Sequence, residues 1–367
     1  MQLIFWTSVF LVFYPHLIYP FLLYVLRRQS EKHRGGGAVG PVAMVCSVYN
    51  EEKVIASKIE NFYRLDYSDV ELYLGLDGCT DNTLAEIRQA QRDDRLKVFV
   101  LPRGGKVRVI NELLEQVQQP YVVMTDANSM FRPDAVEKLM ANLTAGVGVV
   151  CGRLKLIEEG HSGEGIYWRI ETFVKKVESQ WGSVVGANGA IYLLKRELFE
   201  PLPSDTINDD FSISMRIFEK GYGVVYAEDA VAEEQLVTTD AEEFQRHVRD
   251  AAGHFRALLY HWRLLNPLQD KRFFFYLSHR VIRWLVPFFL IAAFASNALL
   301  LRSPLYRVIF LGQCLAYVMV AAVHTFRIRW KPLYVPYYFM LVNAAIMLGF
   351  LRNILGAQKT TWTPTRR

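Results

Sequence analysis

The sequence predicts an α/β domain with a mostly parallel sheet, joined to α-helical membrane-spanning segments. Between residues 42 and 232, short apolar runs alternate with amphipathic helical patterns, which is typical of a sheet covered by helices on both faces. Residues 3–26 contain no Asp, Glu, Lys or Arg over a length that can cross a bilayer. Hydrophobic residues make up 51% of the chain and charged residues 22%, which is too many charges for a protein made only of membrane spans.

The N-terminal segment, residues 1–27, is predicted to be an uncleaved membrane anchor. Its basic residues follow the apolar run, whereas a signal peptide has them first; they are Arg27, Arg28, Lys32 and Arg34. Because basic residues favour the cytoplasmic side, we expect the chain from residue 27 onward in the cytoplasm. Residues 28–41, which include three consecutive glycines, are predicted to be a flexible linker.

The α/β domain is predicted to extend from residue 42 to residue 240. Apolar strands are expected at 42–49, 70–76, 96–101, 121–126 and 190–194. Helices are expected at 52–64, 83–92, 107–118 and 211–219, with a further helix beginning after Arg132-Pro133-Asp134.

The C-terminal third is predicted to be associated with the membrane. Residues 241–283 are basic and aromatic with helical spacing, which predicts interfacial amphipathic helices; packing on the soluble domain is an equally good alternative. A transmembrane bundle is expected at 284–356, with spans at 284–301, 308–326 and 333–355, followed by a tail at 357–367. We expect Pro336 and Asn343 to break the last span, which would then be re-entrant or interfacial instead of crossing the membrane. We therefore expect a multi-pass protein of the inner (plasma) membrane, with its α/β domain in the cytoplasm.

Charge and cysteine content exclude some classes of protein. The formal net charge of +5 is explained by membrane-flanking lysines and arginines that contact anionic lipid head groups, so no nucleic acid partner is expected. The four cysteines are widely spaced and form no CxxC pair, which argues against a disulfide framework or a zinc site. We expect them to be reduced thiols.

Asp126 and Asn128 follow the apolar strand that begins at Tyr121. In open α/β sheets, ligands bind at the carboxyl ends of the strands. A carboxylate separated by one residue from a second oxygen donor suits Mg²⁺ or Mn²⁺ bridging a diphosphate, because these cations prefer oxygen ligands. The alternative is an Asp-Ala-Asn turn that only closes a buried strand.

Polar groups also end the first two strands. Asn50 and Glu51 follow the first strand and Asp77 follows the second, where they could accept hydrogen bonds from a nucleobase or ribose. Helix capping is the alternative, since Asp81 and Thr83 are good cap residues.

Three more loops carry candidate groups. The loop 103–106, Arg-Gly-Gly-Lys, precedes a helix and could approach phosphate, although it lacks the spacing of a P-loop. The loop 186–189, Gly-Ala-Asn-Gly, precedes an apolar strand and could equally be a glycine-rich turn. Asp209 and Asp210 begin a helix after Asn208, and capping explains one of these carboxylates but not both.

Taken in order, the motifs NEE, DGCTDNT, RGGK, TDAN, GANGAIYLLKRELF and NDDF resemble the family 2 glycosyltransferases, which have a GT-A (Rossmann-like) nucleotide-sugar-binding domain. The resemblance is closest to their membrane-embedded bacterial branch, which includes synthases of cellulose, poly-N-acetylglucosamine and hyaluronan. It covers residues 42 to about 235 and extends more loosely through Ser278-His279-Arg280 and Trp284.

The resemblance implies a role for each matching residue. Asn50, Glu51 and Asp77 would hold the nucleotide, Lys106 would lie near the uridine or the phosphates, and Asp126 with Asn128 would occupy the DxD position that handles the sugar diphosphate and its metal. The acceptor loop would contain Gly186, Asn188 and Gly189. The acidic pair would be Asp209 and Asp210, with Asp210 as the base that deprotonates the acceptor hydroxyl.

Two departures from the family pattern matter. Asn128 replaces a carboxylate with a neutral amide, which should weaken cation binding. Processive members carry QxxRW; here Arg249 matches the arginine that contacts the diphosphate, but Arg246 replaces the glutamine and Asp250 replaces the tryptophan. The lost stacking ring counts against processive synthesis.

The resemblance implies an inverting transfer of a hexosyl or N-acetylhexosaminyl unit from a UDP-sugar to a lipid-linked or growing polysaccharide acceptor, with Mg²⁺ or Mn²⁺ as cofactor. The product would be an extracellular polysaccharide, with subunits of an export complex as further partners. A single-transfer polyprenyl-phosphate glycosyltransferase is the alternative within enzymes. A non-catalytic sugar-nucleotide-binding scaffold of an export complex is the alternative from another class.

Overall fold

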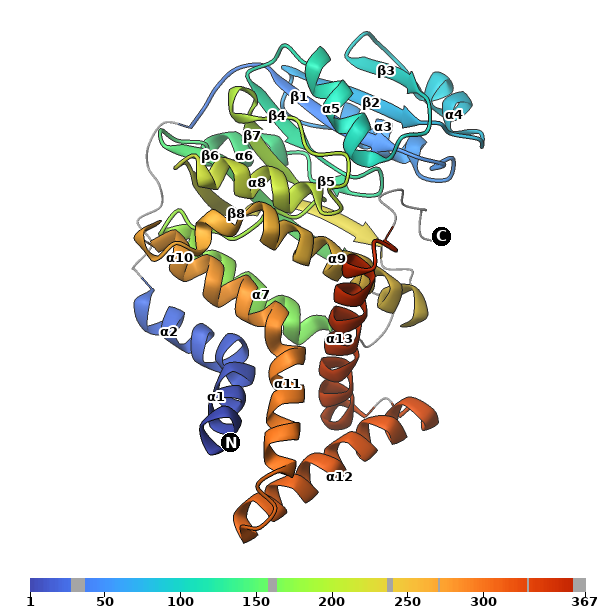
Figure 1. Ribbon diagram of the computed structural model, residues 1–367. Coiled ribbons are helices and arrows are strands. Elements are labelled where there is room, and N and C mark those ends of the chain that lie inside the picture. The colour runs from blue at the N-terminus through green and yellow to red at the C-terminus, as the bar shows by residue number, and fades with distance from the viewer. Residues whose placement is uncertain (28–36, 158–163, 236–239, 270, 329, 359–367) are drawn as a thin grey trace. The chain divides into compact units, whose positions relative to one another are not determined.

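The computed structural model describes residues 1–27, 37–157, 164–235, 240–269, 271–328 and 330–358 (Figure 1). The chain divides into two compact units. One, here named the sheet unit, comprises residues 28–160, 175–238 and 359–367; the other, the helical unit, comprises residues 1–27, 161–174 and 239–358. Most of the predicted linker at 28–41 and of the tail at 357–367 lies outside the described residues.

The sheet unit is built on a single sheet with strand order β3-β2-β1-β4-β7-β6-β8-β5. Its strands are β1 (Val42–Val48), β2 (Val70–Asp77), β3 (Leu96–Leu101), β4 (Tyr121–Met124), β5 (Met130–Phe131), β6 (Val147–Ile157), β7 (Tyr192–Lys195) and β8 (Gly223–Gln235). All five predicted strands are confirmed, within a few residues at their ends. Strands β5, β6 and β8 were not predicted.

The sheet is parallel in its first half and mixed in its second. Strands β3, β2, β1 and β4 are parallel, but β7 is antiparallel to both of its neighbours, β4 and β6. Strand β6 is parallel to β8, and β5 is antiparallel to β8. The expectation of a mostly parallel sheet is therefore confirmed for the first half, whereas the second half combines one parallel pair with antiparallel pairs. The reversed direction of β7 places the start of this strand, Tyr192, beside the carboxyl end of β4 at Met124.

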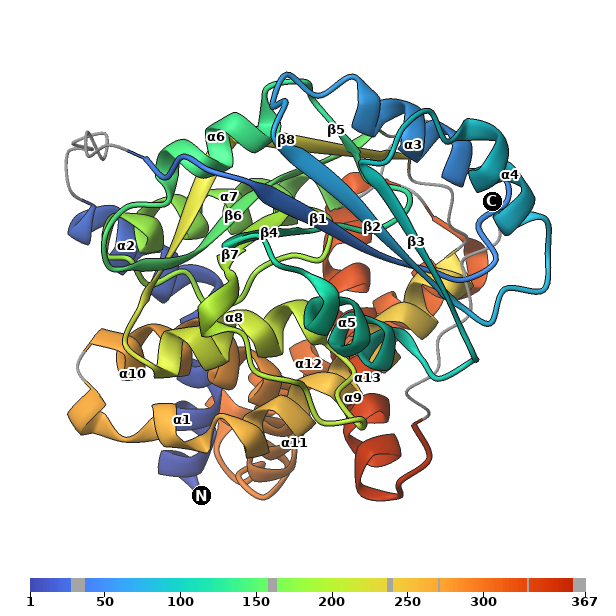
Figure 2. The ribbon, with the colours of Figure 1, turned by 90° about the horizontal axis from the view of Figure 1, so that it is seen from above.

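Helices cover both faces of the sheet, as Figure 2 shows. Helices α3 (Ile55–Tyr63), α4 (Thr83–Ala90) and α6 (Ala135–Asn142) contribute to the main core on one face. Helices α5 (Lys106–Gln116) and α8 (Asp209–Glu219) lie on the other, and η2 (Arg196–Leu198) is a short turn after β7. Close packing explains Gly75 in β2, because a Cβ there would lie 2.3 Å from the Val109 side chain of α5.

The helical unit begins with α1 (Gln2–Phe13), η1 (Tyr14–Ile18) and α2 (Tyr19–Leu26). Its later elements are α9 (Asp240–Tyr260), η3 (Trp262–Leu265), η4 (Pro267–Gln269), α10 (Lys271–Tyr276), η5 (Leu277–Val281), α11 (Ile282–Ala298), α12 (Pro304–Phe326) and α13 (Lys331–Ile354). Helix α7 (Glu164–Gln180) is divided between the two units.

Within the described residues, four helical segments are long and apolar enough to cross a membrane: Gln2–Leu26, Lys271–Ala298, Pro304–Phe326 and Pro332–Ile354. They coincide with the four predicted hydrophobic segments. The second begins 13 residues before the expected residue 284, because α10, η5 and α11 follow one another without interruption. The boundary expected at residue 283 thus lies inside a continuous helical run.

The break expected at Pro336 and Asn343 is wrong, since α13 is a single helix through both residues. Pro336 lies in the second turn of α13, so the ring removes one hydrogen bond near the helix start without ending the helix. The Asn343 side chain donates to the carbonyl of Phe339, one turn earlier, at 2.8 Å. This bond gives the NH2 group of the side chain a partner within the helix.

Helix α9 packs along α13. Phe255 contacts Phe350 with ring centroids 4.9 Å apart, and Tyr338 donates to the Glu243 carboxylate at 2.9 Å. Close approach is possible at Gly349, where a Cβ would lie 2.6 Å from the Ala251 side chain. An interfacial position for residues 241–283 stays a prediction.

Glu171 of α7 is buried beside basic side chains of η5 and α11. Its carboxylate lies 3.3 Å from His279, 3.4 Å from Arg280 and 3.1 Å from Arg283. Burial opposes ionisation of the carboxylate, but His279, Arg280 and Arg283 outweigh that effect and hold the pKa of Glu171 well below its usual range. The Ser278-His279-Arg280 motif therefore has a structural role within the helical unit.

Candidate active site

The predicted site residues lie where strands β1, β2 and β4 end. Asn50 and Glu51 follow β1, Asp77 is the last residue of β2, and Asp126 lies two residues beyond β4. These three strands are parallel, so their carboxyl ends share one edge of the sheet. The structure therefore gathers these groups at the edge where open α/β sheets bind ligands.

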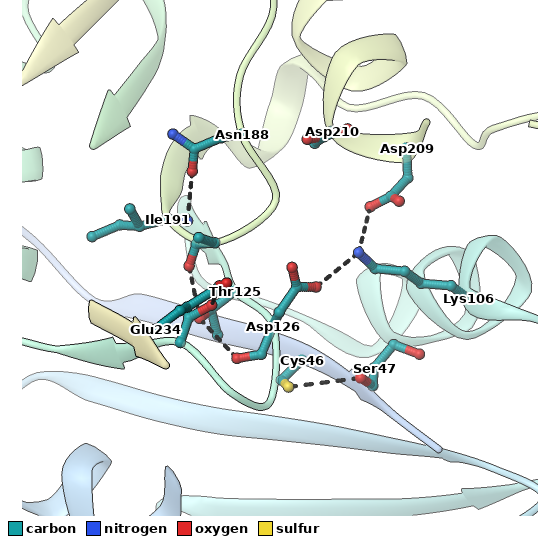
Figure 3. Close-up of polar contacts among 12 residues, drawn as sticks. Cys46, Ser47, Lys106, Thr125, Asp126, Asn188, Ile191, Asp209, Asp210 and Glu234 are labelled. Carbon is teal, nitrogen blue, oxygen red and sulfur yellow. Dashed lines mark hydrogen bonds and ion pairs between the residues drawn. The ribbon is translucent and has the colours of Figure 1, made fainter. Parts of the chain in front are cut away.

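A lysine lies between two carboxylates at this edge (Figure 3). Lys106 begins α5, and its Nζ lies 2.9 Å from Asp126 Oδ1 and 3.3 Å from Asp209 Oδ2. Burial disfavours the ammonium, but Asp126, Asp209 and Asp210 outweigh burial and raise the pKa of Lys106. Lys106 is therefore a permanent cation at the site.

Asp210 faces the same space from the start of α8. Burial and the neighbouring Asp209 carboxylate raise the pKa of Asp210 to about 7. A Cβ on Gly189 would lie 3.0 Å from Asp126 Oδ2 and 3.6 Å from Asp210 Oδ2, so these two carboxylates converge on the glycine. Asn208 is the N-cap residue of α8, but its side chain makes no capping hydrogen bond.

The oxygen atoms of Asp126 and Asn128 fit a divalent cation that takes its remaining coordinating oxygens from a bound substrate. Asp126 supplies a carboxylate, and Asn128 lies in the turn that follows it. No group of three or more His, Cys, Asp or Glu residues that could hold a metal occurs among the described residues. Mg²⁺ is usually held by one or two carboxylates together with substrate phosphates, so this small donor set suits a cation that binds with a diphosphate.

Asp77 and Asn50 are already hydrogen-bonded within the protein. Asp77 is fully buried and accepts from the backbone amides of Gly104, at 2.6 Å, and Gly105, at 3.0 Å, and from the Arg103 guanidinium. This carboxylate thereby fixes the loop that leads to Lys106.

Asn50 and Glu51 bind the loop after β2. Asn50 has a left-handed backbone, with φ of 51°, and its Oδ1 accepts from the Thr80 amide at 2.8 Å. The Glu51 amide donates to Thr83 Oγ1 at 2.8 Å. Asp81 accepts from the Thr83 amide at 3.1 Å, but the N-cap residue of α4 is Asn82, whose side chain makes no capping hydrogen bond.

The predicted acceptor loop ends beside the carboxylates. Gly186 has φ of 92°, a conformation that other residues rarely adopt. The Asn188 side chain is used within the fold: its Nδ2 donates to the Gly152 carbonyl at 3.0 Å and its Oδ1 accepts from the Ile191 amide at 3.2 Å. Gly189 is the member of the loop that lies against the site.

Arg249 lies on α9, which belongs to the helical unit, whereas the other candidate residues belong to the sheet unit. Its guanidinium pairs with the next residue, Asp250, at 3.1 Å. A contact between Arg249 and a diphosphate stays a prediction.

Sequence reasoning gave no role to three residues that support the site. Arg103 pairs with Asp77 and stacks over Tyr49, with its guanidinium carbon 3.4 Å from the ring centroid. Lys58 and Thr125 are buried beneath the Asp126 turn and hydrogen-bonded to each other. Lys58 could have been found from its spacing, because it falls on the apolar face of a predicted helix.

Residues 44–202 match the family "Glycosyl transferase family 2". The chain contains a family 2 glycosyltransferase domain. The match extends from β1 to Leu202, beyond η2, and includes Lys106, Asp126 and Gly189, but it ends before Asp209 and Asp210. The roles of Asp209 and Asp210 therefore stay predictions from their motif.

Curated proteins that are similar to this chain include poly-beta-1,6-N-acetyl-D-glucosamine synthases of Staphylococcus. The Staphylococcus aureus protein is 23% identical over 250 residues, which cover 64% of this chain and 59% of the relative. The Staphylococcus epidermidis protein is 22% identical over 232 residues, 59% of this chain and 55% of the relative. The chain therefore spans less than two thirds of the length of these relatives.

The fold is also that of a solved glycosyltransferase. A mannosyltransferase from Pyrobaculum calidifontis, determined in complex with GDP-Man and Mn²⁺, superposes with a TM-score of 0.76 at 18% identity. The superposition covers 97% of this chain and 99% of the mannosyltransferase. The GT-A fold expected from the motifs is confirmed.

Proposed function

We propose that this protein transfers a hexosyl or N-acetylhexosaminyl unit from a UDP-sugar, with inversion, to a hydroxyl group of a lipid-linked or growing polysaccharide acceptor. The observation that carries the proposal is the convergence of Asp210 and Asp126 on Gly189 beside Lys106. A carboxylate whose pKa is about 7 is suited to accept a proton near neutral pH.

In this reaction, Asp210 takes the proton of the acceptor hydroxyl as the acceptor oxygen attacks the anomeric carbon. The bond between that carbon and the diphosphate oxygen breaks, and the electron pair leaves with UDP. Attack opposite the leaving group inverts the configuration and gives a β-linkage from an α-linked donor. Asp126 and Asn128 would hold a divalent cation, which neutralises charge on the diphosphate.

Lys106 stabilises the same leaving group. Its ammonium lies at the N-terminus of α5, where the backbone amides also favour negative charge. Charge that develops on the departing diphosphate therefore meets fixed positive groups, which is the main way such sites lower the barrier.

The acceptor assignment rests on the helical unit and on the relatives. The polymer named for the staphylococcal relatives favours a polysaccharide product. Four apolar helices favour a multi-pass membrane protein, with the sheet unit in the cytoplasm where sugar nucleotides are made. Asp250, in place of the family's tryptophan, favours a single transfer as the second candidate.

The first test is nucleotide release by the detergent-solubilised protein. We expect release from one sugar nucleotide in a panel of UDP- and GDP-sugars, dependent on Mg²⁺ or Mn²⁺ and abolished by EDTA. The length of the product separates polymer synthesis from single transfer. Donor binding without turnover, in the presence of membrane lipids and oligosaccharide acceptors, would contradict the enzyme and favour a scaffold.

Gly189→Ala is expected to lower kcat/KM by about tenfold or more, because the added methyl would lie 3.0 Å from Asp126 Oδ2 and displace that carboxylate. Gly189 has no positive φ, so alanine fits the backbone and the effect stays local. Gly223→Ala is the matched control, since its Cβ would meet nothing closer than 3.5 Å. Equal activities of the two variants would exclude a role for Gly189 at the site.

A further inference from the structure

Lys58 is a lysine on the buried face of α3. It lies among Ile55, Ile59 and Phe62, and only 1% of Lys58 is exposed. Lysines are almost never buried to this extent unless their charge has a partner. The position of Lys58 therefore requires an explanation.

The Lys58 ammonium holds both ends of the turn that carries Asp126. It donates to Thr125 Oγ1 at 2.8 Å, just before Asp126, and to the Ser129 carbonyl, just after Asn128. The turn itself is closed by the Ser129 amide, which donates to the Asp126 carbonyl at 3.2 Å. One side chain thus fixes the backbone on both sides of the proposed metal ligands.

The same network extends to the acceptor loop. Thr125 Oγ1 donates to the Ala190 carbonyl at 3.0 Å, and Ala190 follows Gly189 in the chain. A shift of Lys58 would therefore move the Asp126 turn and the adjoining glycine together.

The arrangement is unfavourable for stability alone. Burial lowers the pKa of Lys58 to about 8, although Cys46, Asp126 and Glu234 act in the opposite direction. An apolar side chain of similar size usually fills such a place at least as well. A buried lysine here is better explained by the hydrogen bonds that it makes to the turn.

We propose that Lys58 is a positioning residue, which holds the turn 125–129 so that the Asp126 carboxylate meets the cation and the diphosphate. The proposal rests on the metal-dependent sugar transfer proposed above. It assigns Lys58 no contact with substrate.

The test is Mn²⁺ binding by the full-length detergent-solubilised protein with saturating UDP, followed by electron paramagnetic resonance of free Mn²⁺. Lys58→Met alone also removes a positive charge, which by itself would favour the cation. The decisive variant is therefore the double substitution Lys58→Met with Glu234→Gln, which keeps the local net charge. A glutamine at position 234 can still accept from the Ser129 hydroxyl, as Glu234 does. We expect Mn²⁺ affinity to fall by about 10- to 100-fold, as it does when the groups that orient metal ligands are removed.

Asn61→Ala is the matched control on the same helix. The Asn61 side chain bonds the backbone of Phe131, accepting from its amide at 2.8 Å and donating to its carbonyl at 2.7 Å, beyond the Asp126 turn. We expect this variant to lower the thermal unfolding midpoint and to leave Mn²⁺ affinity within about twofold, because Asp126 keeps its support. Normal affinity in the double variant would overturn the positioning role.

Thr125→Val serves if the double variant does not fold. It keeps every charge, removes the hydroxyl that accepts from Lys58, and is expected to weaken Mn²⁺ binding; unchanged affinity would overturn the proposal equally. No Mn²⁺ binding by the unsubstituted protein with UDP would instead overturn the proposed metal-dependent function, and the role of Lys58 with it.

Discussion

Asp210→Asn is expected to lower kcat by about a thousandfold, while UDP affinity stays within a few-fold of the parent protein, because a positioned general base contributes about 10²–10⁴ in rate. The amide keeps the size of the carboxylate but cannot accept the proton. Initial rates of UDP release and equilibrium UDP binding measure the two effects. Loss of binding together with rate would contradict the role of Asp210 as the base.

The pH profile provides a second measure of the same role. The base must be ionised, and the pKa of Asp210 is raised to about 7, so kcat/KM should rise as the pH increases through about 7. The Asp209 carboxylate is a principal cause of that shift after burial. Asp209→Asn should therefore move the rising limb to lower pH, and an unmoved limb would assign it to another group.

Stability supplies a control that does not depend on catalysis. The folded state binds the Asp210 proton more tightly than the unfolded state, so the folded state loses stability as the pH rises from about 4 to about 7. Above pH 7 the parent protein holds a buried, repelled charge that Asp210→Asn lacks. The variant should unfold at a higher temperature than the parent at pH 8, with a smaller difference at pH 5. An equal difference at both values would mean that Asp210 titrates normally.

Much of the fold could be predicted because local patterns dominate its first half. Strands β1 to β4 are apolar runs separated by amphipathic helices, and hydrophobic periodicity is the strongest signal of secondary structure. The antiparallel direction of β7 depends on how distant segments pair, which no local pattern contains. The predicted break at Pro336 was wrong because it relied on a local rule alone. Near a helix start, a proline removes few hydrogen bonds and does not end the helix.

The site divides in the same way. Motifs located Lys106, Asp126 and Asp210, which the structure brings to one edge of the sheet. The hydrogen-bond partners of Asp77 and Asn188 could not be predicted from motifs, because they lie far away in the chain. Asp77 is bound to Arg103 and its loop, and Asn188 is bound to Gly152. Their roles toward ligands stay predictions.

Asp126→Asn is expected to abolish the dependence of UDP binding on Mn²⁺ and to lower kcat by about 10²–10³, the usual effect of removing one group that stabilises transition-state charge. The change also removes a carboxylate that lies 2.9 Å from Lys106, although Lys106 keeps Asp209 at 3.3 Å. Calorimetric titration of UDP with and without Mn²⁺ measures the loss.

Asn128→Asp is the matched gain of function. It restores the second carboxylate of the family's DxD motif, and a further negative ligand should tighten Mn²⁺ binding by about tenfold. Asn128 is half-buried in the turn, and aspartate has nearly the same size, so the substitution fits the site. Opposite shifts in Mn²⁺ affinity at positions 126 and 128 would identify both as ligands. If the affinity is lost in Asp126→Asn but unchanged in Asn128→Asp, the cation is held by Asp126 and a second group other than Asn128.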